Sequence, residues 1–319
     1  MRAPTFASFA RVLLIASVLA AATARPALAA PGDVADGLAV WLRASSGITA
    51  ANGEYVFSWE DGSGNERDAV WTLADLIDFN EFPPLFVASN PSVGGEPTVR
   101  FQNQNALAID LSWLAGSDYT IFVVNGRDRI GVANFYIAGA TFANDNNLVL
   151  GYEEPNRLRL SHFVNDLDAF VEPYLGVPVW SLDSFRFDQS SGRDIFHNGA
   201  HVASDANLTS LASNFGSTLG HFRTYGPLFW FQGELAEVVI YDRALTDAER
   251  LRVESELAAR YGFPLDLEDY VPCGGPWKSH GAYMKAVAHV AATFKEFGVT
   301  VPGQQSTIVA QRASTACGQ

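Results

Sequence analysis

The sequence has little cysteine and a clear shortage of positive charge. Its 319 residues include two cysteines, and 21 Lys and Arg stand against 35 Asp and Glu, which gives a net charge of −14. An acidic surface repels phosphate backbones and anionic lipid heads, so we expect neither a nucleic-acid nor a membrane partner. Because Cys273 and Cys317 both lie in the last fifty residues, the rest of the chain must be held by its own apolar core.

The common catalytic and metal-binding motifs are missing as well. The sequence contains no Gly-x-Ser-x-Gly elbow, no His-Glu-x-x-His pair and no phosphate-binding loop. Its six histidines show no metal-ligand spacing. His197 and His201 flank Asn198 and Gly199, and we expect both histidines to be solvent-exposed side chains of a hairpin. We therefore predict no catalytic residues.

One apolar run is long, and it lies at the start of the chain. Arg2 and Arg11 precede the apolar residues 12–22, and residues 27–29 (Ala-Leu-Ala) form a small-x-small cleavage site. This pattern predicts a secretory signal peptide over residues 1–29, cleaved after Ala29, and not a membrane anchor. The mature protein is therefore expected to be exported, to the periplasm or outside the cell.

Residues 31–264 show short strands separated by Gly, Asn, Asp and Pro. Several strands alternate between apolar and polar residues, as they do when one face is buried and the other is wet. No helical periodicity interrupts the series before Thr246. The sequence thus predicts an all-β domain over residues 30–264, with antiparallel sheets closed as a sandwich or jelly roll. The predicted strands are 38–42, 55–59, 98–101, 119–125, 135–138, 148–152, 157–160, 185–188 and a hairpin over 194–203.

The β-region closes with a strand that leads directly into a helix. Residues 235–241 are apolar on both faces apart from Glu237, which predicts a strand buried between two layers. Thr246 and Glu249 form a capping box, and Gly262 marks the end of the helix that follows.

The tail, residues 265–319, differs in character from the β-region. A Gly- and Pro-rich linker around Cys273 precedes apolar residues at helical spacing, which end near Gly298. A second helix is predicted within residues 304–316. In an exported chain Cys273 and Cys317 are the natural disulfide pair, which would make the tail a stapled helical hairpin. The disulfide would close a loop of about 45 residues, which stabilises the folded tail by about 4 kcal/mol in the chain-entropy model.

Three blocks of the sequence, in order, resemble the laminin-G-like, concanavalin-A-like jelly rolls of exported bacterial proteins. They are residues 37–42 with 56–65, the Asn-Gly hairpin 195–203, and the closing strand and helix 233–249. The resemblance implies two large curved antiparallel sheets with a convex and a concave face. The tail motif Cys-x-Gly-Pro-Trp-Lys-x-His-Gly-x-Tyr is similar to a tail of unassigned function in exported bacterial proteins. Related tails carry further cysteines, and Ala286 stands where one of them is expected.

The resemblance also implies a calcium site. In such jelly rolls a calcium ion bridges an Asp-x-Ser-Gly-Asn turn and the closing strand, so Asp61, Asn65 and Glu237 would supply the oxygen ligands here. The closing strand of the family often has an Asp before its Glu, but this chain has Ala236. The alternative is an Asx-turn in which Asp61 and Asn65 satisfy backbone groups, with a backbone donor or an arginine as the partner of Glu237.

The same fold analogy implies recognition of carbohydrate. Aromatic rings stack on the apolar C–H faces of sugars, and Asn or Asp side chains bind the hydroxyls. We expect a non-catalytic extracellular module that binds a glycan or glycoprotein through loops or the concave sheet face. The candidate ligand-binding residues are Trp113, Asn146, Tyr152, Trp180 and Trp230, with Tyr174 and Tyr225 in similar positions.

Two alternatives stay open. Some enzymes on this fold cleave polysaccharides with two carboxylates that face one cleft from a single strand. Glu234 and Glu237 lie three residues apart and should point to opposite faces, whereas Asp166 and Asp168 share a face in a chain where acidic residues are common. The other alternative is a structural or adhesive envelope protein that binds another protein.

Overall fold

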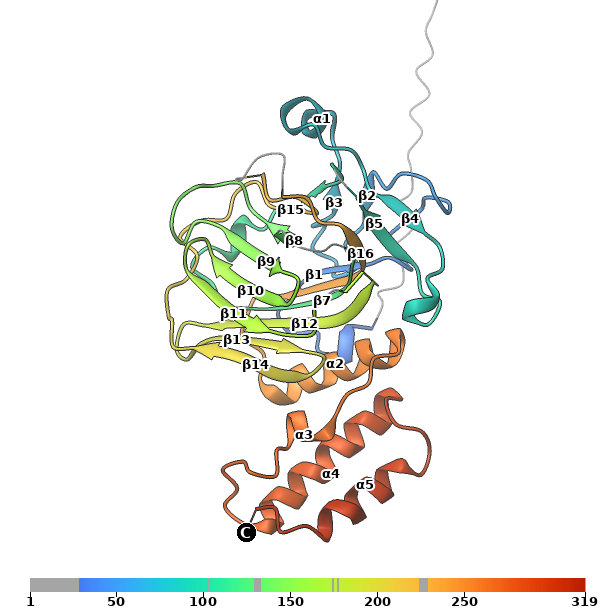
Figure 1. Cartoon of the computed structure of the whole chain (residues 1–319), viewed down its shortest axis with the longest axis vertical. Coiled ribbons are helices and arrows are strands. Elements are labelled where there is room, and N and C mark those ends of the chain that lie inside the picture. The colour runs from blue at the N-terminus through green and yellow to red at the C-terminus, as the bar shows by residue number, and fades with distance from the viewer. Residues whose placement is uncertain are drawn as a thin grey trace, which may run out of the picture.

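The computed structural model describes residues 29–102, 104–128, 133–173, 175–176, 178–223 and 229–318. Apart from Ala29, the predicted signal peptide lies outside these residues. The described chain is an antiparallel β-sandwich of two eight-stranded sheets, followed by a helical tail (Figure 1). This architecture confirms the predicted all-β class. Among the described residues, no helix has the length and apolar character needed to span a membrane.

The first sheet, sheet A, is centred on two long strands, β7 and β16. All nine residues of β7 are buried, because one face packs on the other sheet and the opposite face packs on a helix. The strand order is β14-β13-β12-β7-β16-β5-β4, and β1 also pairs with β16. The bounds are β1 (Leu38–Arg43), β4 (Leu85–Val87), β5 (Thr98–Phe101), β7 (Tyr119–Arg127), β12 (Val179–Asp188), β13 (Gly192–His197), β14 (Ala200–Asp205) and β16 (Gly233–Tyr241).

The second sheet, sheet B, has its longer strands at one end, in the order β11-β10-β9-β8-β15-β6-β3-β2. Strands β8 to β11 form a meander of consecutive antiparallel neighbours. The bounds are β2 (Ser58–Trp59), β3 (Ala69–Val70), β6 (Leu107–Ala108), β8 (Asn134–Ala138), β9 (Leu148–Glu154), β10 (Arg157–His162), β11 (Asp166–Phe170) and β15 (Thr218–Leu219). Short helices lie between strands: η1 (Pro31–Asp33), α1 (Leu73–Phe79), η2 (Pro91–Val93) and η3 (Ser112–Leu114).

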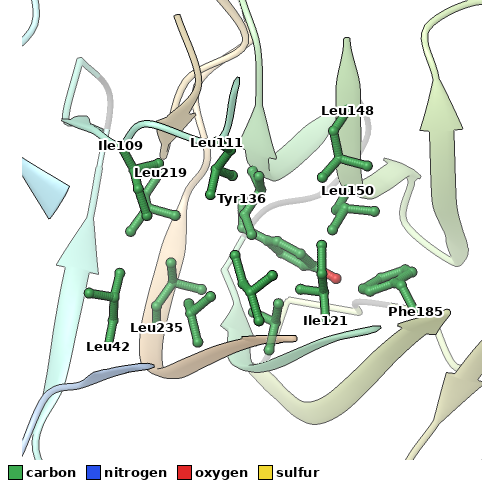
Figure 2. Packing of buried hydrophobic residues seen from close by; sticks show 14 of the residues in the cluster. Leu42, Ile109, Leu111, Ile121, Tyr136, Leu148, Leu150, Phe185, Leu219 and Leu235 are labelled. Atoms are coloured by element: carbon green, nitrogen blue, oxygen red, sulfur yellow. The ribbon is translucent and has the colours of Figure 1, made fainter. Parts of the chain in front are cut away.

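One apolar core fills the space between the two sheets (Figure 2). Leu42, Ile121 and Phe185 reach it from sheet A, and Leu148 and Leu150 reach it from sheet B; all five are fully buried. Burying one such side chain contributes roughly 1.5–3 kcal/mol. The sandwich is therefore held by its core, as the position of the cysteines predicts.

Helix α2 (Asp247–Tyr261) covers the outer face of sheet A. The predicted capping box is present: the Thr246 hydroxyl accepts from the Glu249 amide at 3.3 Å, and the Glu249 carboxylate accepts from the Thr246 amide at 2.9 Å. Gly262 ends the helix with a φ of 77°. The apolar side of α2 packs on outward side chains of β7, β12 and β16.

A β-bulge in β16 determines where Glu237 points. The pairing of β16 with β7 slips by one residue between Leu235 and Glu237. Leu235 and Val238 both point into the core, and Glu237 points outward to α2. Glu234, which precedes the inward Leu235, faces outward as well. The prediction that Glu234 and Glu237 point to opposite faces is wrong, because the bulge adds one residue to the alternation.

The tail consists of α3 (Leu267–Tyr270), α4 (His280–Phe297) and α5 (Gln304–Ala313). A disulfide joins Cys273 and Cys317, as the sequence predicts, and α4 ends at Gly298 with a φ of 84°. Leu251 of α2 belongs to the same apolar cluster as the inward side of α4, so the tail packs on α2. In Figure 1, α2 lies between the sandwich and the tail helices.

Candidate functional site: a hollow on sheet B

The outer face of sheet B carries a hollow of about 320 Å³, which we call the sheet B hollow. Leu148 and Leu150 of β9 point into the core, so the alternating residues Val149 and Glu153 point outward into the hollow. Its lining comes from β8 to β11 and from two connecting segments: Phe135, Val149, Glu153, Arg159, Ser161, Phe163, Val164, Asp166, Phe222 and Phe229.

A row of residues that crosses the middle of this face includes a glycine, Gly151. The register places Phe135 of β8, Gly151 of β9, Arg159 of β10 and Asp168 of β11 in one row across the sheet. A Cβ at Gly151 would lie 2.6 Å from the Cα of Phe135, and its φ of 139° is one that other residues rarely adopt. Glycine is therefore required at this position by the close approach of β8, and the row has no side chain between Phe135 and Arg159.

Phenylalanine rings form the apolar wall of the hollow. The ring of Phe222 lies edge-on, 5.6 Å from Phe135 and 6.2 Å from Phe163, and Phe163 in turn meets Phe142 at 6.1 Å. Such edge-to-face pairs contribute about 0.5–1.5 kcal/mol beyond their buried area. The wall is therefore preformed, and it ends at the rim in Phe142, which is 69% exposed.

Arginine and carboxylate side chains form the opposite wall. Arg159 donates Nε and Nη2 to the two carboxylate oxygens of Asp168 at 2.8 and 2.9 Å, and its Nη1 lies 3.0 Å from both Glu153 and Asp166. One guanidinium therefore meets three carboxylates, and this wall carries a net negative charge. Burial raises the pKa of Glu153, although Arg159 acts in the opposite direction.

A strained turn forms part of the rim. Two of the three residues between β10 and β11, Phe163 and Val164, have φ values of 34° and 68°. A β-branched residue at positive φ is a genuine outlier, and a strained residue of this kind costs about 1–3 kcal/mol. The turn is held by a hydrogen bond from His162 N to Asn165 O and by one from Asn165 Nδ2 to Asp145 Oδ1. The strain places two apolar side chains on the rim, where Val164 is 63% exposed.

The hollow thus offers aromatic surface on one side and carboxylate acceptors on the other. A site of this kind binds a molecule that has an apolar face and several O–H or N–H donors. An acidic ligand would meet the net negative wall, and Arg159 is already bound to three carboxylates. The geometry therefore favours neutral or positively charged ligands.

The five predicted ligand-binding residues do not gather in this hollow. Trp113 lies in η3, Trp180 lies in β12, and Asn146 lies in the loop between β8 and β9; all three are half-buried. The lining of the hollow includes none of them. Tyr174 and Tyr225 lie outside the described residues.

Tyr152 and Trp230 are buried, in contrast to the exposed positions expected for them. Tyr152 points into the core from β9, and its hydroxyl donates to Asp183 at 2.8 Å. Trp230 is 3% exposed and lies flat on His221, with the ring centroids 3.5 Å apart. Neither ring reaches a ligand at the surface in this structure. Aromatic residue type does not distinguish a core ring from an exposed one, which is why the sequence misplaced them.

The three predicted calcium ligands are bound to protein groups. Glu237 accepts hydrogen bonds from Arg260 and Tyr261, both at 2.7 Å. Asp61 accepts backbone N–H groups at 2.8 and 2.9 Å, and Asn65 donates to a backbone carbonyl at 2.9 Å. No group of three His, Cys, Asp or Glu side chains in the described ranges is arranged to hold a metal ion. In this structure both carboxylate oxygens of Glu237 are bound by protein donors, and calcium binding stays a prediction to be tested.

One hairpin histidine is buried, which corrects the expectation for this pair. His201 is exposed, but His197 is 6% exposed and lies between the two sheets. Its Nδ1 lies 2.7 Å from Asp183 and its Nε2 lies 2.7 Å from Glu172. Burial by itself lowers the pKa of His197, but these carboxylates raise it to about 9. His197 is therefore a charged member of an inter-sheet network.

Most residues that line the hollow were not among the predicted binding residues. The predicted strands 148–152 and 157–160 contain its central residues, and the shared face of Asp166 and Asp168 was visible as an alternation. The residues of β10, Arg-Leu-Arg-Leu-Ser, show the same pattern. Charged residues that alternate with Leu along neighbouring strands were thus the available indication of this site.

No family model matches the sequence, and no curated protein matches it. Among solved structures, the chain is similar to domain 4 of AbnA, an extracellular GH43 arabinanase from Geobacillus stearothermophilus in complex with arabinotriose. The identity is 15% and the TM-score is 0.45, over 68% of this chain and 97% of that domain.

Two structures derived from sialidases match at a similarly low sequence identity. Trypanosoma rangeli sialidase with 2,3-difluorosialic acid matches at 17% identity and a TM-score of 0.45, over 70% of this chain and 33% of the sialidase. The CBM40 of the Ruminococcus gnavus IT-sialidase, bound to α2,6-sialyllactose, matches at 17% identity and a TM-score of 0.38, over 48% of this chain and 95% of that module. At these values the likeness is distant and assigns no ligand to this chain.

Proposed function

We propose that the protein is an exported, non-catalytic module that recognises a neutral or amino-bearing glycan, or a glycoprotein that carries one, through the sheet B hollow. The observation that carries this proposal is the pairing of a phenylalanine wall with a carboxylate wall across Gly151. The aromatic wall matches the apolar face of a sugar ring, and Glu153 and Asp166 match its hydroxyl or ammonium donors.

The charge of the hollow narrows the ligand class. Arg159 pairs with Glu153, Asp166 and Asp168, so one positive charge meets three negative ones at the hollow. An acidic sugar would have to displace a carboxylate from Arg159 before it could bind. Neutral sugars avoid this cost, and an amino sugar gains from the excess negative charge.

Two adjacent residues of β9 provide a matched test. Glu153 lines the hollow, whereas Glu154 is 54% exposed and lies outside the lining. Glu153→Gln should weaken binding of the best glycan from an array by about ten- to a hundredfold, as expected for a lost charge-assisted hydrogen bond. Glu154→Gln should leave the affinity unchanged, as measured by isothermal titration calorimetry. If no glycan on the array bound the protein, or if both variants lost affinity equally, the proposal would be contradicted.

A substitution at Val164 is expected to change glycan affinity and folding stability in opposite directions. Asparagine tolerates positive φ better than valine does, so Val164→Asn should raise the free energy of unfolding while it removes apolar surface from the rim. We expect a higher midpoint in urea together with weaker glycan binding. A variant that gains stability and keeps full affinity would show that the rim does not contact the ligand.

A polysaccharide-cleaving enzyme is the second candidate. Glu153 and Asp166 come from different strands and bind the same nitrogen of Arg159, so the structure does bring two carboxylates to one face. Arg159 lies between them, where the bond to be cleaved would have to lie, which favours binding over hydrolysis. Release of reducing sugar from a polysaccharide panel by the wild type, and its loss in Glu153→Gln, would favour the enzyme. Binding to a deglycosylated protein partner would favour the adhesive alternative.

A further inference from the structure

A larger cavity, of about 980 Å³, lies between the sandwich and the tail. We call it the seam cavity. The turn of the β13–β14 hairpin lines one side, and α3, the α4–α5 connection and α5 line the other. Ligand pockets occupy about 300–1,000 Å³ and are frequent where two parts of a fold meet. The seam cavity is separate from the sheet B hollow, with which it shares no lining residue.

The wall formed by the tail includes an apolar part that is incompletely packed. Leu265, Phe294 and Ile308 face the cavity, and Leu265 and Ile308 are only partly buried. Helix α5 has no fully buried residue; it is tied to the tail by the disulfide and by an ion pair between Arg312 and Glu268. The helix is therefore held in place without filling the space in front of it.

Asp269 gives the cavity a carboxylate without a direct partner. It forms no side-chain hydrogen bond or ion pair with any group in the described part of the chain, and burial together with nearby acidic residues raises its pKa, although Arg250 acts in the opposite direction. The two basic residues of the lining are already neutralised: Arg312 binds Glu268, and His197 binds Glu172 and Asp183. A positively charged group is thus the complement that the lining lacks.

We propose that the seam cavity binds a small organic cation, an ammonium group on an apolar body. The ammonium would pair with Asp269, and the apolar body would cover Leu265, Phe294 and Ile308. Thr300 also lines this cavity. This proposal does not depend on glycan binding by sheet B.

A pair of isosteric probes isolates the charge. Phenethylamine and phenethyl alcohol have nearly the same shape, but only the amine is positively charged at neutral pH. The wild-type protein should bind phenethylamine saturably in calorimetry and should bind the alcohol about tenfold more weakly or less, since a charged hydrogen bond contributes more than a neutral one. Equal affinity for both probes, or no saturable binding of either, would overturn the proposal.

Two variants with matched controls locate the site. Asp269→Asn should weaken phenethylamine binding by about tenfold, and Asp78→Asn on the distant, exposed α1 should not. Thr307→Trp should place an indole ring in the cavity and weaken binding, whereas Ser306→Trp, at an exposed neighbour on α5 outside the lining, should leave binding unchanged. Unchanged binding in both Asp269→Asn and Thr307→Trp would place the probe elsewhere and refute the proposal. Glycan binding should persist in all four variants.

Discussion

Replacing His197 with glutamine should remove a pH-dependent part of the stability of the sandwich. His197 connects Asp183, which is fully buried, to Glu172 at the edge of the inter-sheet space. Asp183 also accepts hydrogen bonds from Tyr152 at 2.8 Å and from Asn125 at 2.7 Å. Burial opposes ionisation of Asp183, but His197, Tyr152 and Arg127 keep the pKa of Asp183 below its ordinary value. The charged side chains of His197 and Asp183 thus form an ion pair that is enclosed between the two sheets.

The magnitude follows from the pKa of His197. It is raised from 6.5 to about 9 in the folded protein, and one pKa unit corresponds to about 1.4 kcal/mol, so the ionised form contributes about 3 kcal/mol. Because the folded pKa lies above the unfolded one, this contribution is complete below pH 6.5 and is lost as the pH rises through 9. The wild-type protein should therefore lose about 3 kcal/mol of unfolding free energy across this window.

Urea unfolding at a series of pH values measures this loss directly. His197→Gln should be less stable than the wild type by about 3–5 kcal/mol below pH 6.5, because Asp183 loses its charged partner. Its stability should then vary much less on the alkaline side. His201→Gln is the matched control, since His201 is exposed and this variant should keep the wild-type slope. An alkaline slope that persists unchanged in His197→Gln would refute the reasoning.

Four further predictions concern the fold and calcium. Reducing the Cys273–Cys317 disulfide should destabilise the tail by about 4 kcal/mol for a separation of 44 residues, seen in urea unfolding with and without reductant. Thr246→Ala should cost about 1 kcal/mol through loss of the α2 cap, with Thr246→Ser as a near-neutral control. Leu150→Ala should cost about 2–5 kcal/mol in the fully buried core. If calcium binds at Asp61, EDTA should lower the Tm of the wild type but not of Asp61→Asn, and an unchanged wild-type Tm would contradict that prediction.

The longer elements could be predicted because their side chains repeat with the period of the structure. The predicted strands 119–125 and 148–152 lie within β7 (Tyr119–Arg127) and β9 (Leu148–Glu154). The capping box at Thr246 and the stop at Gly262 placed α2 closely. Because local interactions determine these features, the local sequence is sufficient to predict them.

Features that depend on the neighbouring strand could not be predicted from the local sequence. Alternation over residues 55–59 predicts a strand, but only Ser58–Trp59 is one, and Tyr55 and Phe57 are 52% and 55% exposed. The bulge at Glu237 is equally invisible, because nothing in the local sequence shows that β16 and β7 differ by one residue there. Both outcomes depend on which strand lies alongside, which is a property of the whole sheet.

The sheet B hollow depends on the same kind of long-range information. Alternation shows that Glu153, Arg159 and Asp166 each leave the core face of a strand, but it does not show that β9, β10 and β11 are neighbours. Nor does it show that α2 covers sheet A and leaves the outer face of sheet B accessible. The role of Gly151 likewise becomes clear only from the register, which places it between Phe135 and Arg159, where the close backbone of β8 leaves no room for a Cβ. For a sandwich of this kind, outward charges on consecutive strands of a meander are therefore the sequence pattern from which such a hollow could be predicted.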